Sequence, residues 1–141
     1  MVWVATGLNF KIESTRLGHA MRKSTIVLLG IIIFSIIVGI LFYPKMPEKM
    51  ATHWNARGEV DGYSSKLLGV SIIPIVLFGA ILLFLAIPKI DPLKVNIEKF
   101  RKYYDGFIVL FSIFMLSIFL QLILWNLGIE ISPTIIFPIG I

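Results

Sequence analysis

The sequence predicts an all-α membrane protein with three transmembrane helices, a short fourth hydrophobic stub, and a small structured extracytoplasmic loop between the first two helices. Of its 141 residues, 57% are hydrophobic and only 15% are charged, whereas soluble domains carry about 25% charged residues. The apolar residues also gather in three blocks that are each long enough to cross a bilayer. These two observations together argue against a water-soluble globule.

The first two blocks, 25–43 and 67–87, contain no charged residue. In lipid every backbone N–H and C=O must be paired within its own segment, so uninterrupted apolar runs form helices even where Val, Ile and Phe would favour strands in water. Small residues are expected to mark where these helices touch, since they let backbones approach closely. Ser35 and Gly39 form one such patch on the first helix, and Gly79 and Ala80 form another on the second.

The third helix is expected over 96–127, with Asn96 as its N-cap and apolar residues following at helical spacing. Gln121 and Asn126 are the strongly polar side chains in its apolar part. A buried amide there is costly unless it is paired. For Gln121 an interhelical hydrogen bond and a contact with a ligand or ion both remain open.

The basic residues predict the orientation, because Lys and Arg accumulate in short cytoplasmic loops. Four lie before the first helix, four between the first and second, five between the second and third, and none after it. We therefore expect the N-terminus and loop 88–105 in the cytoplasm and loop 44–66 outside, in a multi-pass protein of the cell membrane. Trp54 and Tyr63 are then suited to the outer interface.

The two ends of the chain differ from the rest. Residues 1–20 have mixed polarity and no helical period, and we expect either a disordered tail or sequence upstream of a true start at Met21. The membrane domain is thus expected over 21–141. Residues 133–141 resemble the start of a fourth helix but are too few to span. We therefore expect missing C-terminal helices or a homo-oligomer to complete the bundle.

Composition and motifs exclude several functions. The absence of Cys removes disulfide scaffolds, Cys-ligated zinc and Cys nucleophiles. No nucleophile elbow, HExxH zinc motif, phosphate loop or dinucleotide fingerprint occurs, so we expect no enzyme and no cofactor. The positive charge is divided among segments that flank the membrane, which argues against nucleic acid as a partner and favours anionic membrane lipid.

Loop 44–66 carries most of the functional information. Pro47 keeps the chain extended after the first helix, and Gly58 is a turn former. The segments Ala51–Asn55 and Glu59–Tyr63 are expected to pair as a hairpin. Such a compact loop is more than a connection between two helices needs.

Three roles are open for the polar side chains of this loop. In the first, His53, Asn55, Asp61 and Lys66 hydrogen-bond one another and the turn backbone, which makes them structural. In the second, they recognise a ligand or an extracellular peptide. In the third, His53 forms a weak metal site with Glu59 and Asp61, a one-histidine, two-carboxylate arrangement.

The loop also resembles the signature of the SdpI-like membrane proteins, a family built around a domain of unknown function. The matching residues are Pro47, His53, Trp54, Asn55, Gly58, Asp61, Gly62, Tyr63 and Lys66, followed later by Gln121 and by Trp125, Asn126, Leu127 and Gly128. Better-studied members confer immunity to a secreted toxic peptide, and the namesake also sequesters a repressor at the membrane. Members of the namesake type continue through further helices that this sequence lacks.

The resemblance implies a protein that binds or senses a peptide or small amphipathic compound at the outer face, in an immunity-like role. The alternative is a subunit of a membrane transport or pore assembly, for which Pro74 and Gln121 inside the apolar blocks are the motivation.

Overall fold

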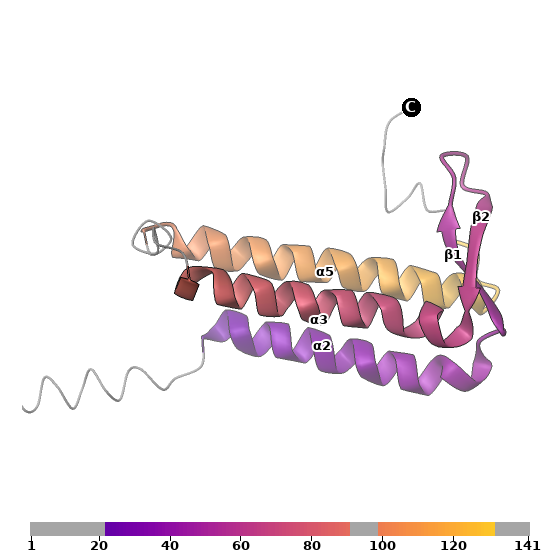
Figure 1. The fold of residues 1–141 in the computed structure, drawn as a ribbon, viewed down its shortest axis with the longest axis horizontal. Coiled ribbons are helices and arrows are strands. Elements are labelled where there is room, and N and C mark those ends of the chain that lie inside the picture. The colour runs from indigo at the N-terminus through magenta and orange to yellow at the C-terminus, as the bar shows by residue number, and fades with distance from the viewer. Residues whose placement is uncertain (1–21, 91–98, 132–141) are drawn as a thin grey trace, which may run out of the picture.

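The computed structural model of the chain describes residues 22–90 and 99–131. Within them, three long helices lie side by side and a two-stranded hairpin stands at one end of the bundle (Figure 1). The elements in chain order are helix α2 (Lys23–Phe42), 3-10 helix η1 (Tyr43–Lys45), strands β1 (Lys49–Trp54) and β2 (Val60–Ser65), and helices α3 (Lys66–Ile90) and α5 (Arg101–Asn126). The tail 1–20, the expected cap Asn96 and the stub 133–141 lie outside the described residues.

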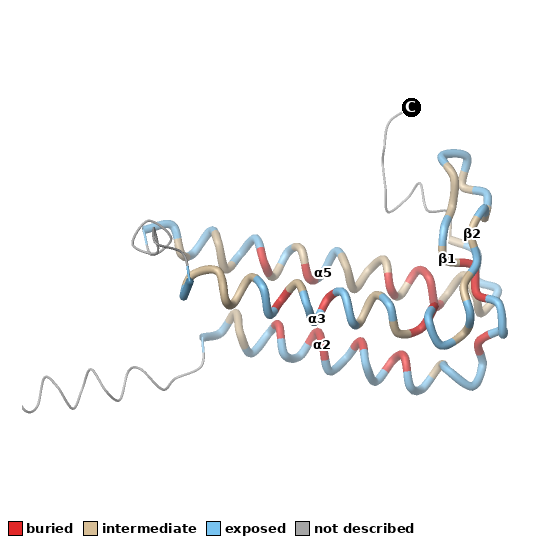
Figure 2. The backbone as a smooth tube through the Cα atoms, in the orientation of Figure 1, coloured by how far each residue is buried: buried red, intermediate tan, exposed pale blue. Residues whose placement is uncertain are grey.

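All three long helices are long and apolar enough to cross a membrane, which confirms the main prediction for the fold. The helices contact one another in every pair. Their buried residues follow the seams between them, while the outward faces are exposed (Figure 2). Those outward faces carry large apolar side chains such as Ile40, Ile75 and Leu110. A bundle dissolved in water presents charged and polar residues there, so this apolar exterior fits a lipid environment.

The core divides into two clusters along the bundle. The cluster next to the hairpin consists of Val38, Met46, Met50, Val70, Phe119, Leu122 and Ile123. The cluster towards the other end consists of Leu28, Ile31, Ile32, Leu77, Ile81 and Ile108. Because Met50 comes from strand β1, the hairpin shares the first cluster with the helices and is packed onto the bundle.

One of the two expected small-residue patches lies at a helix contact. Ser35 and Gly39 are buried, and a Cβ atom added to Gly39 would lie 3.2 Å from Val70 Cγ1 of α3. The prediction for Gly79 is wrong, since a Cβ there would meet nothing within 4 Å. Helix α3 turns Leu77 and Ile81 towards its neighbours instead, and Gly79, between them in sequence, lies on another face of the helix.

Helix α3 continues through Pro88 to Ile90, beyond the expected end of this block. A proline inside a helix has no N–H for the carbonyl four residues earlier, which for Pro88 is that of Phe84. The Tyr104 hydroxyl of α5 donates a hydrogen bond to this carbonyl at 2.7 Å. A partner from the neighbouring helix thus satisfies the backbone oxygen that proline frees.

Helix α5 begins at Arg101 with Phe100 in the cap position, and no side chain caps it by a hydrogen bond. Its first turns are held by contacts with other helices. The Asp105 carboxylate accepts hydrogen bonds from Ser24 Oγ of α2 at 3.1 Å and from Arg101 Nε at 3.1 Å. This polar contact joins α2 to α5 at the end of the bundle opposite the hairpin.

Candidate functional site

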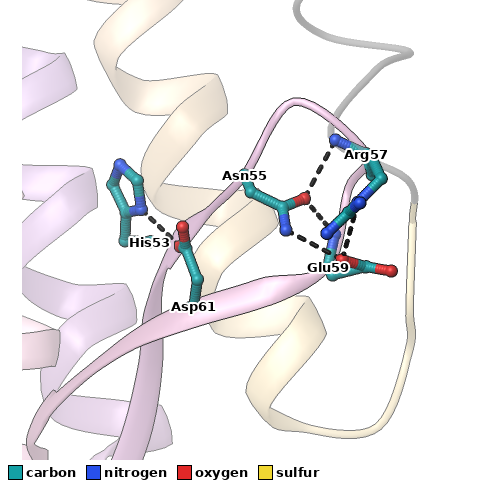
Figure 3. A network of polar contacts seen from close by, with 5 residues as sticks. All are labelled: His53, Asn55, Arg57, Glu59 and Asp61. Carbon is teal, nitrogen blue, oxygen red and sulfur yellow. Dashed lines mark hydrogen bonds and ion pairs between the residues drawn. The ribbon is translucent and has the colours of Figure 1, made fainter.

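The hairpin turn is built by Asn55. Its Oδ1 accepts hydrogen bonds from the backbone N–H groups of Arg57 at 2.9 Å and Glu59 at 3.0 Å, and its Nδ2 donates to Glu59 Oε2 (Figure 3). Gly58 has a φ of 79°, which favours glycine because other residues are strained there. The expected hairpin is confirmed, with Asn55 and Gly58 as the residues that make the turn.

Two irregularities shape the strand pairing. Ala51 pairs with Tyr63, His53 with Gly62, and Trp54 with Val60. Thr52 on β1 and Asp61 on β2 are therefore extra residues without a directly opposed partner. Such bulges bend a strand and re-aim its side chains.

The bulges bring together His53 and Asp61. The imidazole Nδ1 lies 2.5 Å from Asp61 Oδ1, and both side chains remain accessible, at 72% and 43% exposure (Figure 3). Gly62 makes this approach feasible, since a Cβ atom there would lie 2.7 Å from His53 Cβ. The sequence Asp61-Gly62 therefore serves to hold an exposed histidine–carboxylate pair.

The expected contacts among His53, Asn55, Asp61 and Lys66 form in part, since His53 bonds Asp61 and Asn55 bonds the turn backbone, but Lys66 lies apart from them. His53 contacts Asp61, Asn55 organises the turn, and Lys66 lies at the base of the hairpin, 3.6 Å from Glu48. Their positions separate them: His53 and Asp61 lie at the bulges within the strands, Asn55 lies in the turn, and Lys66 follows the end of β2.

The metal hypothesis needs Glu59 to join His53 and Asp61. Glu59 instead accepts hydrogen bonds from Asn55 Nδ2 and from Arg57 Nε at 3.0 Å. Within 22–90 and 99–131 there is no group of three residues suited to hold a metal ion. The idea of a one-histidine, two-carboxylate site is therefore wrong for this conformation.

Asn126, at the end of α5, attaches the hairpin to the bundle. Its Oδ1 accepts from Ala51 N–H at 2.8 Å, and its Nδ2 donates to Ala51 C=O at 2.9 Å and to Leu122 C=O at 2.9 Å. The amide thus pairs with both backbone groups of Ala51, as a neighbouring strand would. It blocks this edge of β1 and fixes the hairpin against α5.

Apolar contacts complete the attachment. Met50 is fully buried against Gly69, where an added Cβ would lie 2.7 Å from Met50 Sδ. The rings of Trp54 and Trp125 meet edge to face, with centroids 5.4 Å apart. Trp54, expected as an interface ring, therefore packs partly into the core, whereas Tyr63 remains 65% exposed.

Gln121 is buried and its Nε2 donates to the backbone oxygen of Ile131 at 3.2 Å. This partner follows its own helix in sequence, so the expected interhelical bond is wrong. The chain turns back at Gly128, where φ is 87° and the N–H bonds to Trp125 C=O. Gln121 thus holds the segment that leaves α5.

Several residues of the site escaped sequence reasoning. Met50, Ala51 and Gly69 carry the contact between hairpin and bundle, and Glu48 contacts Lys66. Ala51 and Gly69 have no functional group in their side chains to mark them. In the structure β2 ends at Ser65 and α3 begins at Lys66 without a linker, which brings the hairpin close to the first turns of α3.

Three apolar helices with a hairpin packed on one end define a multi-pass membrane protein. Residues 30–78 match the model of a family described as a domain of unknown function, DUF1648. The matched stretch runs from α2 through η1 and both strands into α3. No curated protein and no solved structure matches the chain.

Proposed function

We propose that the hairpin is a recognition surface for an extracellular peptide or small amphipathic compound, and that the protein protects the cell from it or reports it. The observation that carries this proposal is the exposed His53–Asp61 pair on a hairpin that is fixed to the bundle by Asn126, Met50 and Trp54. The resemblance of the loop to SdpI-like proteins supports the immunity-like role.

The fixed attachment favours binding because it lowers the entropic cost of ordering a binding surface. The exposed side chains of the hairpin combine an imidazole, a carboxylate and the Tyr63 ring, with Arg57 and Glu59 at the turn. A surface with both charges and an aromatic ring suits a ligand that has polar and apolar parts. Exposed pairs of this kind contribute little to stability, so a purely structural role does not explain their presence on the hairpin well.

The proposal predicts that Asp61→Asn removes protection and leaves the fold intact. Cells that express the full chain should survive higher doses of at least one peptide in a panel of membrane-active peptides. The variant should lose that advantage, while its free energy of unfolding in detergent changes by less than about 1 kcal/mol, because the pair is solvent-exposed. Minimal inhibitory concentrations and thermal melts provide the two measurements.

The matched control is Ser117→Ala, which removes a hydroxyl of α5 that bonds the backbone of its own helix at Phe114. This variant should protect as well as the unmodified protein. Equal survival with and without the protein across the panel would contradict the proposed function.

The orientation is a separate prediction, and the absence of Cys makes it testable. Single Cys residues at Ser65 and at Lys94 should react differently with a membrane-impermeant thiol reagent in intact cells. Ser65→Cys should be labelled directly, and Lys94→Cys only after permeabilisation, because the distribution of Lys and Arg predicts a cytoplasmic loop at 88–105. The opposite labelling pattern would place the hairpin in the cytoplasm and would contradict the proposal that it binds an extracellular ligand.

A further inference from the structure

An apolar groove lies between α2 and α3 at the hairpin end of the bundle. We propose that it binds one acyl chain of an anionic phospholipid, with the lipid headgroup at Lys66 and Lys45. This site is distinct from the exposed hairpin surface, and the proposal does not depend on the function proposed above.

The groove has a volume of about 310 Å³, at the lower end of the range for ligand pockets. It is lined by Gly39, Ile40, Tyr43, Pro44, Leu67, Val70 and Ser71. Ser71 Oγ donates to its own helix at Leu67 C=O, 2.6 Å away, so its hydroxyl hydrogen is already used. The lining is thus suited to a hydrocarbon chain. No described residue of α5 contributes to it, so the groove belongs to the α2–α3 seam.

The end of the groove is basic. Lys66 is the first residue of α3, and its ammonium lies 4.9 Å from the centroid of the Tyr43 ring, which lines the groove. Lys45 of η1 is exposed and directly follows Pro44, which lines the groove, and its ammonium lies 5.7 Å from the centroid of the Phe42 ring. The first turn of α3 contains no acidic residue, so the positive end of the helix dipole adds to the same potential.

Glu48 offsets one of these two positive charges, so the two lysines and this carboxylate together carry a net charge of +1. Its carboxylate lies 3.6 Å from Lys66 Nζ, longer than a good hydrogen bond, and its side chain is 90% exposed. The Lys66 side chain is itself only 15% exposed, so the solvent-exposed Glu48 carboxylate is the partner that another anion can replace. The ammonium of Lys66 therefore keeps the capacity to bind a phosphate oxygen.

The shape and position of the groove favour a lipid over a protein helix. An added helix needs a long continuous face, whereas this groove is confined to the last turns of α2 and the first turns of α3 and is bounded by Pro44. These turns lie at the ends of candidate membrane spans, where the apolar core of a bilayer gives way to headgroups. An acyl chain along the seam then places its phosphate beside the two lysines.

The test uses the purified full chain in a neutral detergent. Phosphatidylglycerol and phosphatidylcholine with identical acyl chains are added separately, and bound lipid is quantified by native mass spectrometry. We expect preferential binding of phosphatidylglycerol. Lys66→Gln should weaken that binding about fivefold, the effect of one basic side chain at an anionic lipid surface. The control Lys49→Gln neutralises an exposed lysine of β1, whereas Lys66 lies over the Tyr43 ring of the groove, and it should leave the binding unchanged.

Ser71→Phe tests the groove itself by filling it, and should abolish phosphatidylglycerol binding. Gly79→Phe is the matched control, since it adds the same ring to α3 where nothing lies within 4 Å. Equal binding of the two lipids would overturn the proposal, and so would an unchanged affinity in Lys66→Gln. The proposal would also be wrong if the lipid-free protein were a dimer that Ser71→Phe converts to a monomer, since the groove would then be an interface between two copies. If Ser71→Phe does not fold, the comparison of Lys66→Gln with Lys49→Gln decides the outcome.

Discussion

Replacing Asn126 by Leu is expected to lower the free energy of unfolding by about 2–6 kcal/mol, because two backbone groups lose their partner and each costs about 1–3 kcal/mol when left unpaired. In the native protein the amide binds both the N–H and the C=O of Ala51. Leu has the same number of side-chain heavy atoms in the same branched arrangement, so it keeps the shape of the side chain while it removes the hydrogen bonds. Thermal and denaturant unfolding in detergent micelles measure it.

Hydrogen exchange at Ala51 gives a local test of the same variant. The Ala51 amide should exchange faster in Asn126→Leu, while amides in the middle of α2 keep their protection. In Asn126→Asp the exchange rate of the Ala51 amide should lie between the rates in the native protein and in Asn126→Leu. The carboxylate still accepts from Ala51 N–H but no longer donates to Ala51 C=O. Unchanged protection of the Ala51 amide in the Leu variant would show that Asn126 does not hold the hairpin.

Gly69→Ala is expected to destabilise the protein by about 1–3 kcal/mol through overpacking. The new Cβ would lie 2.7 Å from Met50 Sδ and 3.0 Å from Met50 Cβ. The sulfur can move, but the Cβ is fixed to the backbone of β1, so the hairpin itself has to shift. The midpoint of thermal unfolding and the proteolysis rate of the hairpin measure the effect.

Two variants separate this clash from a general effect of alanine in α3. Gly79→Ala, which meets nothing within 4 Å, should not destabilise the protein, since alanine is favoured over glycine in a helix interior by about 0.5–1 kcal/mol. In a Met50→Ala background, Gly69→Ala should cost less than it does alone, because the side chain that it meets has been shortened. Equal effects at Gly69 and Gly79 would rule out the contact with Met50 as the cause.

The turn chemistry of the hairpin could be predicted from local sequence, and so could the three helices. Long apolar blocks have one solution in lipid, since only a helix pairs all backbone groups within its own segment. Gly58 supplies a positive φ, and Asn55 carries an acceptor that reaches the next backbone N–H groups. Each of these features depends on residues within a few positions of one another.

The contacts that place the site depended on the tertiary structure. Gly39 and Gly79 look equivalent as small residues, yet only Gly39 of these two faces another helix, because the bundle geometry decides which side is covered. His53 and Asp61 meet because two bulges change the register between them. No periodicity in the sequence reports such a shift.

The amino-acid sequence by itself determined that this protein has three membrane-length helices and a turn-forming loop, because hydrophobic length and turn preference act locally along the chain. The attachment of that loop was decided by folding. Asn126 and Ala51 are 75 positions apart, and Met50 is buried only once α3 presents a glycine to it. The contact between the Asn126 amide and the Ala51 backbone forms only when the three helices pack together, and local sequence preferences do not determine that packing.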